Sequence, residues 1–147
     1  MSNRDIASDL VRSMEATRAA EFDVLLRSWA SGGVDKNDTI QGLAKIAENG
    51  PIDERIRAVK LIGALKLTQL ESLMTGILDS EFPNDVVAQM LAAKTKTLPT
   101  YMLLASLCAT LMIFNSKNGI EKSEQIAKRF RDTWIAEYLG AIKAALP

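Results

Sequence analysis

The sequence contains no histidine in its 147 residues. Histidine is the commonest general base and the commonest transition-metal ligand in proteins, so its absence removes Ser-His and Cys-His nucleophile pairs and histidine metal sites. The chain also has no Gly-x-Gly-x-x-Gly and no Gly-x-x-x-x-Gly-Lys sequence, the two common glycine-rich phosphate-binding patterns. We therefore expect a protein that is not an enzyme and that carries no cofactor and no metal.

Cysteine is almost absent as well, because Cys108 is the only one. A single cysteine excludes an intramolecular disulfide and indicates a reducing compartment. The first 18 residues, MSNRDIASDLVRSMEATR, carry charges every few positions and have no apolar run of the kind found in a secretory signal. We expect a cytoplasmic protein.

The chain has no excess of charge of either sign, since 18 lysines and arginines balance 18 aspartates and glutamates. There is no overall basic field to attract nucleic acid or an anionic membrane, and we expect neither as the partner. A surface near neutrality also does little to keep copies of the chain apart, which permits a homo-oligomer. With 48% hydrophobic residues the chain has enough apolar material for one core. We expect a single domain over residues 1–147.

What is present is a long uncharged stretch, Thr97 to Ser116, between two lysines. Leu98 precedes Pro99, and a residue before proline is pushed out of the α region, so a helix is predicted to begin at Pro99 and to end near Asn115. Such a helix is about 24 Å long, which is short of the roughly 30 Å of a bilayer core. The stretch is therefore predicted to be a buried central helix over about residues 99–115.

Apolar residues at three- and four-residue steps predict further helices, and no strand is expected. The fold class predicted is an all-α compact bundle of six or seven helices around the central one. The other helices are expected at about residues 3–30, 38–48, 53–66, 68–81, 84–97 and 121–146. Glycine is unfavourable inside a helix, so the four glycines expected there are predicted to mark close helix crossings, and Gly119 is predicted to lie in a turn. These four are Gly42, Gly63, Gly76 and Gly140.

Part of the chain carries a repeat-like pattern between residues 53 and 97. An Ile56-Arg57 pair follows two acids, the sequence Ile62-Gly63-Ala64-Leu65 ends that helix, and Val86-Val87 follows after a second apolar segment that closes with Asp79. This segment resembles HEAT-type helical repeats, in which helix pairs stack into a superhelix. The resemblance implies a binding scaffold, and a short HEAT-like α-α superhelix is the alternative fold.

Aromatic side chains supply the candidate partner surfaces. In the last expected helix Phe130, Trp134 and Tyr138 are spaced by four, and the first expected helix ends near Trp29. Tryptophan and tyrosine are typical anchors of protein interfaces. Four cations beside the last group are candidate nucleic-acid contacts, because aromatics beside cations can stack bases and hold phosphates. These cations are Lys122, Lys128, Arg129 and Arg131.

The function predicted from these observations is a non-enzymatic protein–protein interaction module of the adaptor or inhibitor type, acting on another protein and able to self-associate. Two alternatives stay open. The first is a nucleic-acid-binding helical protein that uses the basic and aromatic residues 122–138. The second is a membrane-active helical bundle that releases its buried helix into lipid.

Overall fold

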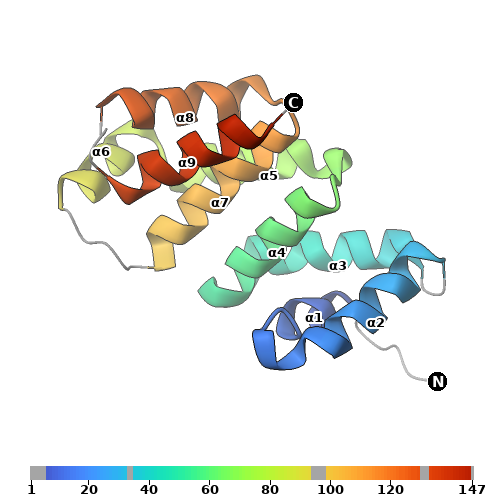
Figure 1. The fold of residues 1–147 in the computed structure, drawn as a ribbon. Coiled ribbons are helices and arrows are strands. Elements are labelled where there is room, and N and C mark those ends of the chain that lie inside the picture. Colours follow the sequence, from blue (N-terminus) through green and yellow to red (C-terminus); the bar gives the residue numbers. More distant parts are fainter. Residues whose placement is uncertain (1–5, 33–34, 94–98, 130–132, 147) are drawn as a thin grey trace.

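The computed structural model describes residues 6–32, 35–93, 99–129 and 133–146, and this part of the chain is helical without a strand (Figure 1). The predicted all-α class is confirmed. Both ends of the chain hold two helices where one was predicted, so the described residues contain nine α-helices and not six or seven. They are α1 (Ile6–Arg12), α2 (Ala19–Ala30), α3 (Lys36–Asn49), α4 (Ile52–Ala64), α5 (Glu71–Glu81), α6 (Asn84–Ala92), α7 (Pro99–Ile113), α8 (Lys117–Arg129) and α9 (Trp134–Ala145).

The predicted central helix is α7, and its burial is confirmed. Every residue from Leu103 to Met112 is buried, as is Tyr101. Helices α4, α5, α8 and α9 pack against α7, and Figure 1 shows it running behind α9 with α8 above it and α4 below. No solvent-facing side remains along most of this helix, because the sequence supplies no polar stripe that could face water.

Gly63 lies where α4 packs closely against α7, as predicted. A Cβ atom at this position would come within 2.7 Å of the Thr110 hydroxyl oxygen. That hydroxyl donates a hydrogen bond to the Val59 carbonyl oxygen of α4 at 3.0 Å. The two helices are therefore joined by a buried polar contact that only a glycine at position 63 leaves room for.

Three other glycines do not occupy the positions predicted for them. A Cβ atom at Gly76 or Gly140 would meet no atom of the described residues within 4 Å, so neither glycine is a crossing contact. Gly119, predicted in a turn, is buried in α8, where a Cβ would come within 2.2 Å of Leu111. The turn lies earlier because Asn115 takes the left-handed conformation (φ 59°), and the Ser116 N–H then donates to the Leu111 carbonyl at 2.8 Å.

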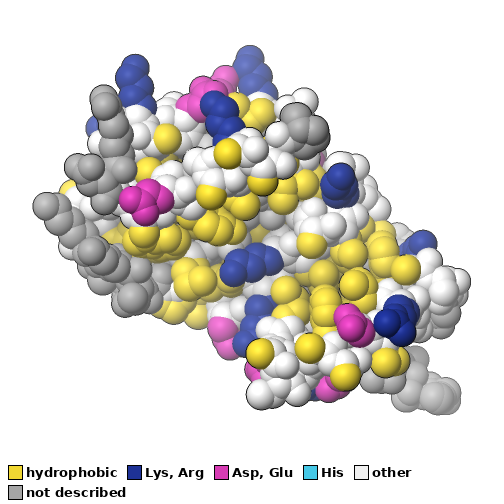
Figure 2. All heavy atoms as spheres, in the orientation of Figure 1, with side chains coloured by type: hydrophobic (Ala, Val, Ile, Leu, Met, Phe, Trp, Pro, Cys, Tyr) yellow, Lys and Arg dark blue, Asp and Glu magenta, His cyan; other side chains and the backbone are white. Residues whose placement is uncertain are grey.

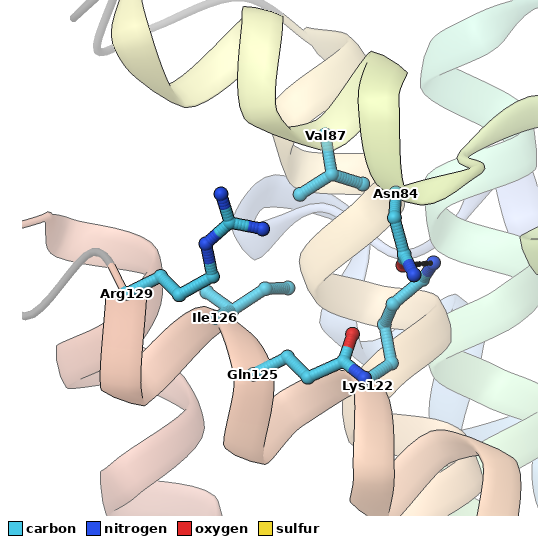
Figure 3. Close-up of a pocket in the computed structure, with 6 residues that line it drawn as sticks. All are labelled: Asn84, Val87, Lys122, Gln125, Ile126 and Arg129. Atoms are coloured by element: carbon cyan, nitrogen blue, oxygen red, sulfur yellow. Dashed lines mark hydrogen bonds between the residues drawn. The ribbon is translucent and has the colours of Figure 1, made fainter.

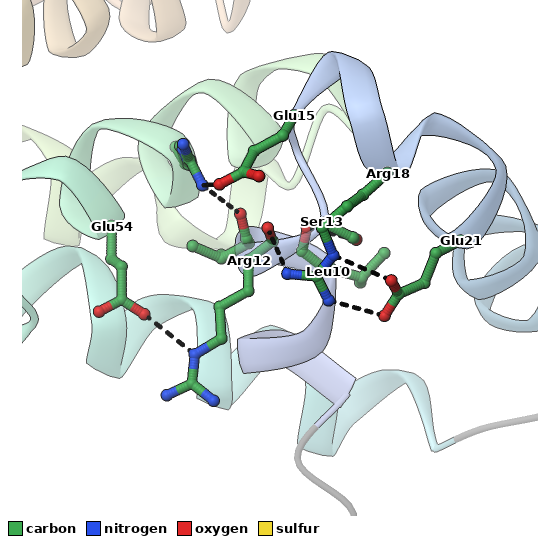
Figure 4. Close-up of polar contacts among 9 residues, drawn as sticks. Leu10, Arg12, Ser13, Glu15, Arg18, Glu21 and Glu54 are labelled. Carbon is green, nitrogen blue, oxygen red and sulfur yellow. Dashed lines mark hydrogen bonds and ion pairs between the residues drawn. The ribbon is translucent and has the colours of Figure 1, made fainter.

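The first predicted helix, residues 3–30, is divided into α1 and α2 by a short 3-10 helix, η1 (Ala16–Arg18). Side chains donate hydrogen bonds to the carbonyl oxygens at the end of α1 (Figure 4). Three donors contact them: Ser13 to Leu10 (3.0 Å), Arg18 to Arg12 (3.0 Å) and Arg57 to Val11 (3.4 Å). Since Arg57 belongs to α4, the end of α1 is set partly by a distant segment of the chain.

Arg55 joins three helices in the region that resembles HEAT repeats. Its Nε donates to the Ala47 carbonyl oxygen near the end of α3 at 2.7 Å, and its Nη1 donates to Glu81 of α5 at 3.0 Å. The Arg55 side chain is 12% exposed and the Glu81 side chain 40% exposed, so the bond to the Ala47 carbonyl is partly shielded from water and the bonds to Glu81 lie at the surface. Helix α4 nevertheless packs chiefly against α3 and α7. The HEAT-like resemblance stays a prediction.

Candidate functional site

Trp29, the first predicted anchor, is half-buried at the end of α2. The Lys36 ammonium lies 5.0 Å from the centre of its ring, a cation–π contact from the start of α3. The indole Nε1 is buried and has no hydrogen-bond partner among the described residues. The contact between Lys36 and Trp29 was not predicted from the sequence, because the two residues are seven positions apart and separated by a glycine turn. The Trp29 side chain therefore packs against the core and contacts Lys36, and only part of it reaches solvent.

Trp134 and Tyr138 lie on α9, where both are half-buried against the core. Thr133 caps this helix, since its hydroxyl oxygen accepts a hydrogen bond from the Ala136 N–H at 3.3 Å. Ile135 and Leu139 are fully buried and fix the orientation of the helix on α7 and α8. Burial raises the pKa of the Tyr138 hydroxyl. Each of the two aromatic rings therefore has one side anchored in the core and another side that reaches the surface.

The single long helix predicted over residues 121–146 is wrong, because α8 ends at Arg129 and α9 begins at Trp134. Phe130 and Arg131 lie outside the described residues. The remaining candidates are consequently split: Lys122, Lys128 and Arg129 lie on α8. Trp134 and Tyr138 lie on α9, which packs against α8. Cations and aromatics do not share one side of one helix, which was the arrangement proposed for stacking bases.

Lys122 and Arg129 border a shallow pocket between α8 and α6 (Figure 3). The Lys122 ammonium donates to the Asn84 side-chain oxygen at 2.7 Å, so it ties α8 to the first residue of α6. Val87, Gln125 and Ile126 complete the lining, and the volume is about 20 Å³. A cavity of that size holds about one water molecule, whereas small-molecule sites occupy about 300–1,000 Å³. Lys128 lies away from the pocket, on the same helix.

Other chemistry finds little support in the described residues. Cys108 is fully buried, and burial raises the pKa of its thiol to about 12, which keeps it protonated and unreactive. No group of three or more aspartate, glutamate or cysteine side chains in the described part of the chain is placed to hold a metal ion. Among the helices described, none has the length and apolar character needed to cross a membrane.

Hydrophobic side chains gather on one face of the molecule (Figure 2). One group lies along the lower side of α9 and over the adjacent end of α7, and a second lies between α4 and α2, with lysine or arginine side chains between the two groups. Partly buried hydrophobic residues that belong to α9 and α2 are Trp134, Tyr138 and Ile142, and Phe22, Leu26 and Trp29. Comparison with known proteins finds no family model, no curated protein and no solved structure that matches this chain.

Proposed function

We propose that the chain is a non-enzymatic protein–protein interaction module of the adaptor or inhibitor type, and that its partner binds at the α9 surface. This surface consists of Trp134, Tyr138, Ile142 and the exposed Ala141. The observation that carries the proposal is the half-burial of Trp134 and Tyr138. A ring whose inner side is packed loses little conformational freedom when its outer side binds a partner.

The surroundings of the α9 surface support this proposal. Interfaces combine an apolar centre with a polar rim, and the exposed Glu137 and Lys143 would supply that rim. The hydrophobic group along α9 continues onto α7 in Figure 2, so the apolar area is larger than one helix edge. Met102 of α7 is 41% exposed. These features favour a protein partner over a small ligand.

Nucleic acid is the less favoured partner. Lys122 is engaged by Asn84 (2.7 Å), and α8 also carries Glu121 and Glu124 on exposed positions. Acids between cations weaken the local positive field that phosphate binding depends on. The proposal therefore rests on the aromatic residues of α9 and not on the cations of α8.

A charged side chain at Ala141 tests the proposal without disturbing the core. Ala141 follows Trp134 by seven residues, so it lies within about 20° of Trp134 around the helix, and it is exposed. Ala141→Glu should leave the fold intact and place an unpaired charge in the interface. The matched control is Ala92→Glu, the same change on an exposed position of α6.

The measurement is affinity capture from the source cells with quantitative mass spectrometry, comparing the parent chain with both variants. We expect at least one protein whose capture falls about tenfold or more with Ala141→Glu and is unchanged with Ala92→Glu. If every captured protein responds equally to the two variants, the α9 surface is not the binding site.

A further inference from the structure

The most exposed large hydrophobic side chain of the described residues is Val24 on α2, which is 66% exposed. The inner side of this helix is formed by the buried Leu25 and the half-buried Phe22 and Trp29. At about 100° per residue Val24 lies opposite these side chains and points directly into solvent. One turn earlier Ala20 is also exposed, so the outer face of α2 is small and apolar along its middle.

Two opposite charges flank Val24 on the same side. Asp23 precedes it by one residue and Arg27 follows it by three, which places them about 100° and 60° away in the same direction around the helix. Both are exposed, and neither forms an ion pair within the part of the chain that the structure describes. Glu21, on the other side of Val24, is held by Arg18 at 2.8 Å. The outer face of α2 therefore has an apolar centre and one unused acid–base pair.

We propose that a second copy of this chain docks on the outer face of α2, with the two α2 helices antiparallel and Val24 packed on Val24 across a two-fold axis. A symmetric pair buries the same patch on both copies. In the antiparallel arrangement Asp23 of each copy lies on the same side of the contact as the partner's Arg27, about 3 Å apart along the helix axis. Each dimer then contains two identical ion pairs.

The charge pattern selects this arrangement. In a parallel pair the two-fold axis runs along the helices and carries the partner's Arg27 to the opposite side of the contact from Asp23, so the charges do not meet. The small Ala20 side chains allow helix axes to approach to about 8–10 Å, the usual packing distance. The net charge of zero adds no general repulsion between copies.

The contact is a single helix crossing, smaller than the roughly 1,200–2,000 Å² of a standard interface, so the dimer should be weak and depend on concentration. It uses a different helix from the α9 surface and does not depend on the proposed function. Substitutions on α2 are accordingly expected to leave capture through α9 unchanged.

Cysteine cross-linking tests the contact directly. In Val24→Cys the two introduced thiols face each other across the two-fold axis, while Cys108 is fully buried and does not compete. The control is Ala144→Cys, another exposed site, on α9. With copper phenanthroline as the oxidant, Val24→Cys should form a covalent dimer at least about tenfold faster than the control. Equal rates for the two variants would overturn the proposal.

Charge exchange tests the antiparallel register. In the Val24→Cys background, Arg27→Asp alone and Asp23→Arg alone should each slow cross-linking about threefold or more, because like charges then meet across the contact. Mixing the two variants brings arginines on one chain against aspartates on the other. We expect a mixed dimer, distinguishable by mass, that forms as fast as the Val24→Cys dimer. A mixture that cross-links no faster than its components would refute the register, because pairing within a single helix cannot produce rescue by mixing.

Discussion

Replacing Gly63 with alanine should destabilise the protein, although alanine is the better helix former. The added methyl group would come within 2.7 Å of the Thr110 hydroxyl oxygen and 3.3 Å of its Cβ. Overpacking of this kind typically costs about 1–3 kcal/mol. Displacing the hydroxyl also weakens its 3.0 Å bond to the Val59 carbonyl, and an unsatisfied buried hydroxyl costs about 1–3 kcal/mol.

Helix propensity opposes this loss, since alanine is favoured over glycine by about 0.8–1.0 kcal/mol inside a helix. The net effect expected for Gly63→Ala is a loss of about 1–5 kcal/mol in the free energy of unfolding. For a chain of this length that corresponds to a fall of about 3–15 °C in the thermal midpoint.

Gly140→Ala is the matched control, because a Cβ at that position meets no atom of the described residues within 4 Å. There the helix-propensity gain stands alone, so the midpoint should rise by about 2–4 °C. Circular dichroism melting and urea titration of the two variants measure both changes. A Gly63→Ala protein as stable as the parent, or more stable, would refute the close-packed crossing of α4 and α7.

A double variant separates steric from general effects. Thr110→Ala removes the hydroxyl that the new methyl group would strike. Gly63→Ala with Thr110→Ala should therefore cost less than the sum of the two single changes, since contacting residues are not additive. Strict additivity would mean that the two side chains do not compete for the same space.

Three further predictions concern stability. Arg55→Ala removes the hydrogen bonds to the Ala47 carbonyl and to Glu81, so it should lower the free energy of unfolding, measured by urea titration, by about 1–3 kcal/mol. The control is Arg12→Ala, whose side chain is 62% exposed and which should change the free energy of unfolding by under about 1 kcal/mol. Lys66 has the left-handed backbone conformation (φ 54°), in which a side chain costs about 1–2 kcal/mol, so Lys66→Gly should raise the thermal midpoint. An unchanged midpoint would contradict the expected relief of backbone strain. Because burial raises the Cys108 pKa from 9.0 to about 12, ionisation favours the unfolded chain, so stability should be complete below pH 9 and fall as pH rises towards 12; a Cys108→Ala variant should lose stability less steeply over that interval.

The central helix could be predicted from the sequence because its determinants are local. An uncharged stretch must be buried, Pro99 sets its start, and its length is too short for a bilayer. Helices α3 to α6 were predicted for the same reason, from apolar periodicity and turn residues. The anchors Trp29, Trp134 and Tyr138 were chosen by residue type, and the structure adds that each is half-buried.

Two helix boundaries were predicted wrongly, one because of a contact between distant segments and one because a local helix cap was missed. Helix α1 ends where it does partly because Arg57 of α4 donates a hydrogen bond to the Val11 carbonyl, and the sequence does not indicate that contact. The end of α8 and the start of α9 at Trp134 were missed, although Thr133 is a residue type that commonly caps a helix. That one missed cap placed Tyr138 and Lys122 on the same helix in the prediction.

The sequence by itself determined that this protein is helical and that residues 99–113 form its central helix, because hydrophobic burial and helix initiation depend on residue type and order along the chain. Tertiary structure decided which glycines are crossings, which aromatic rings keep an exposed side, and that Val24 faces water. These properties depend on how the helices are oriented in the packed chain. Gly63 and Gly140 both sit inside helices, and only the presence or absence of a neighbouring helix distinguishes them.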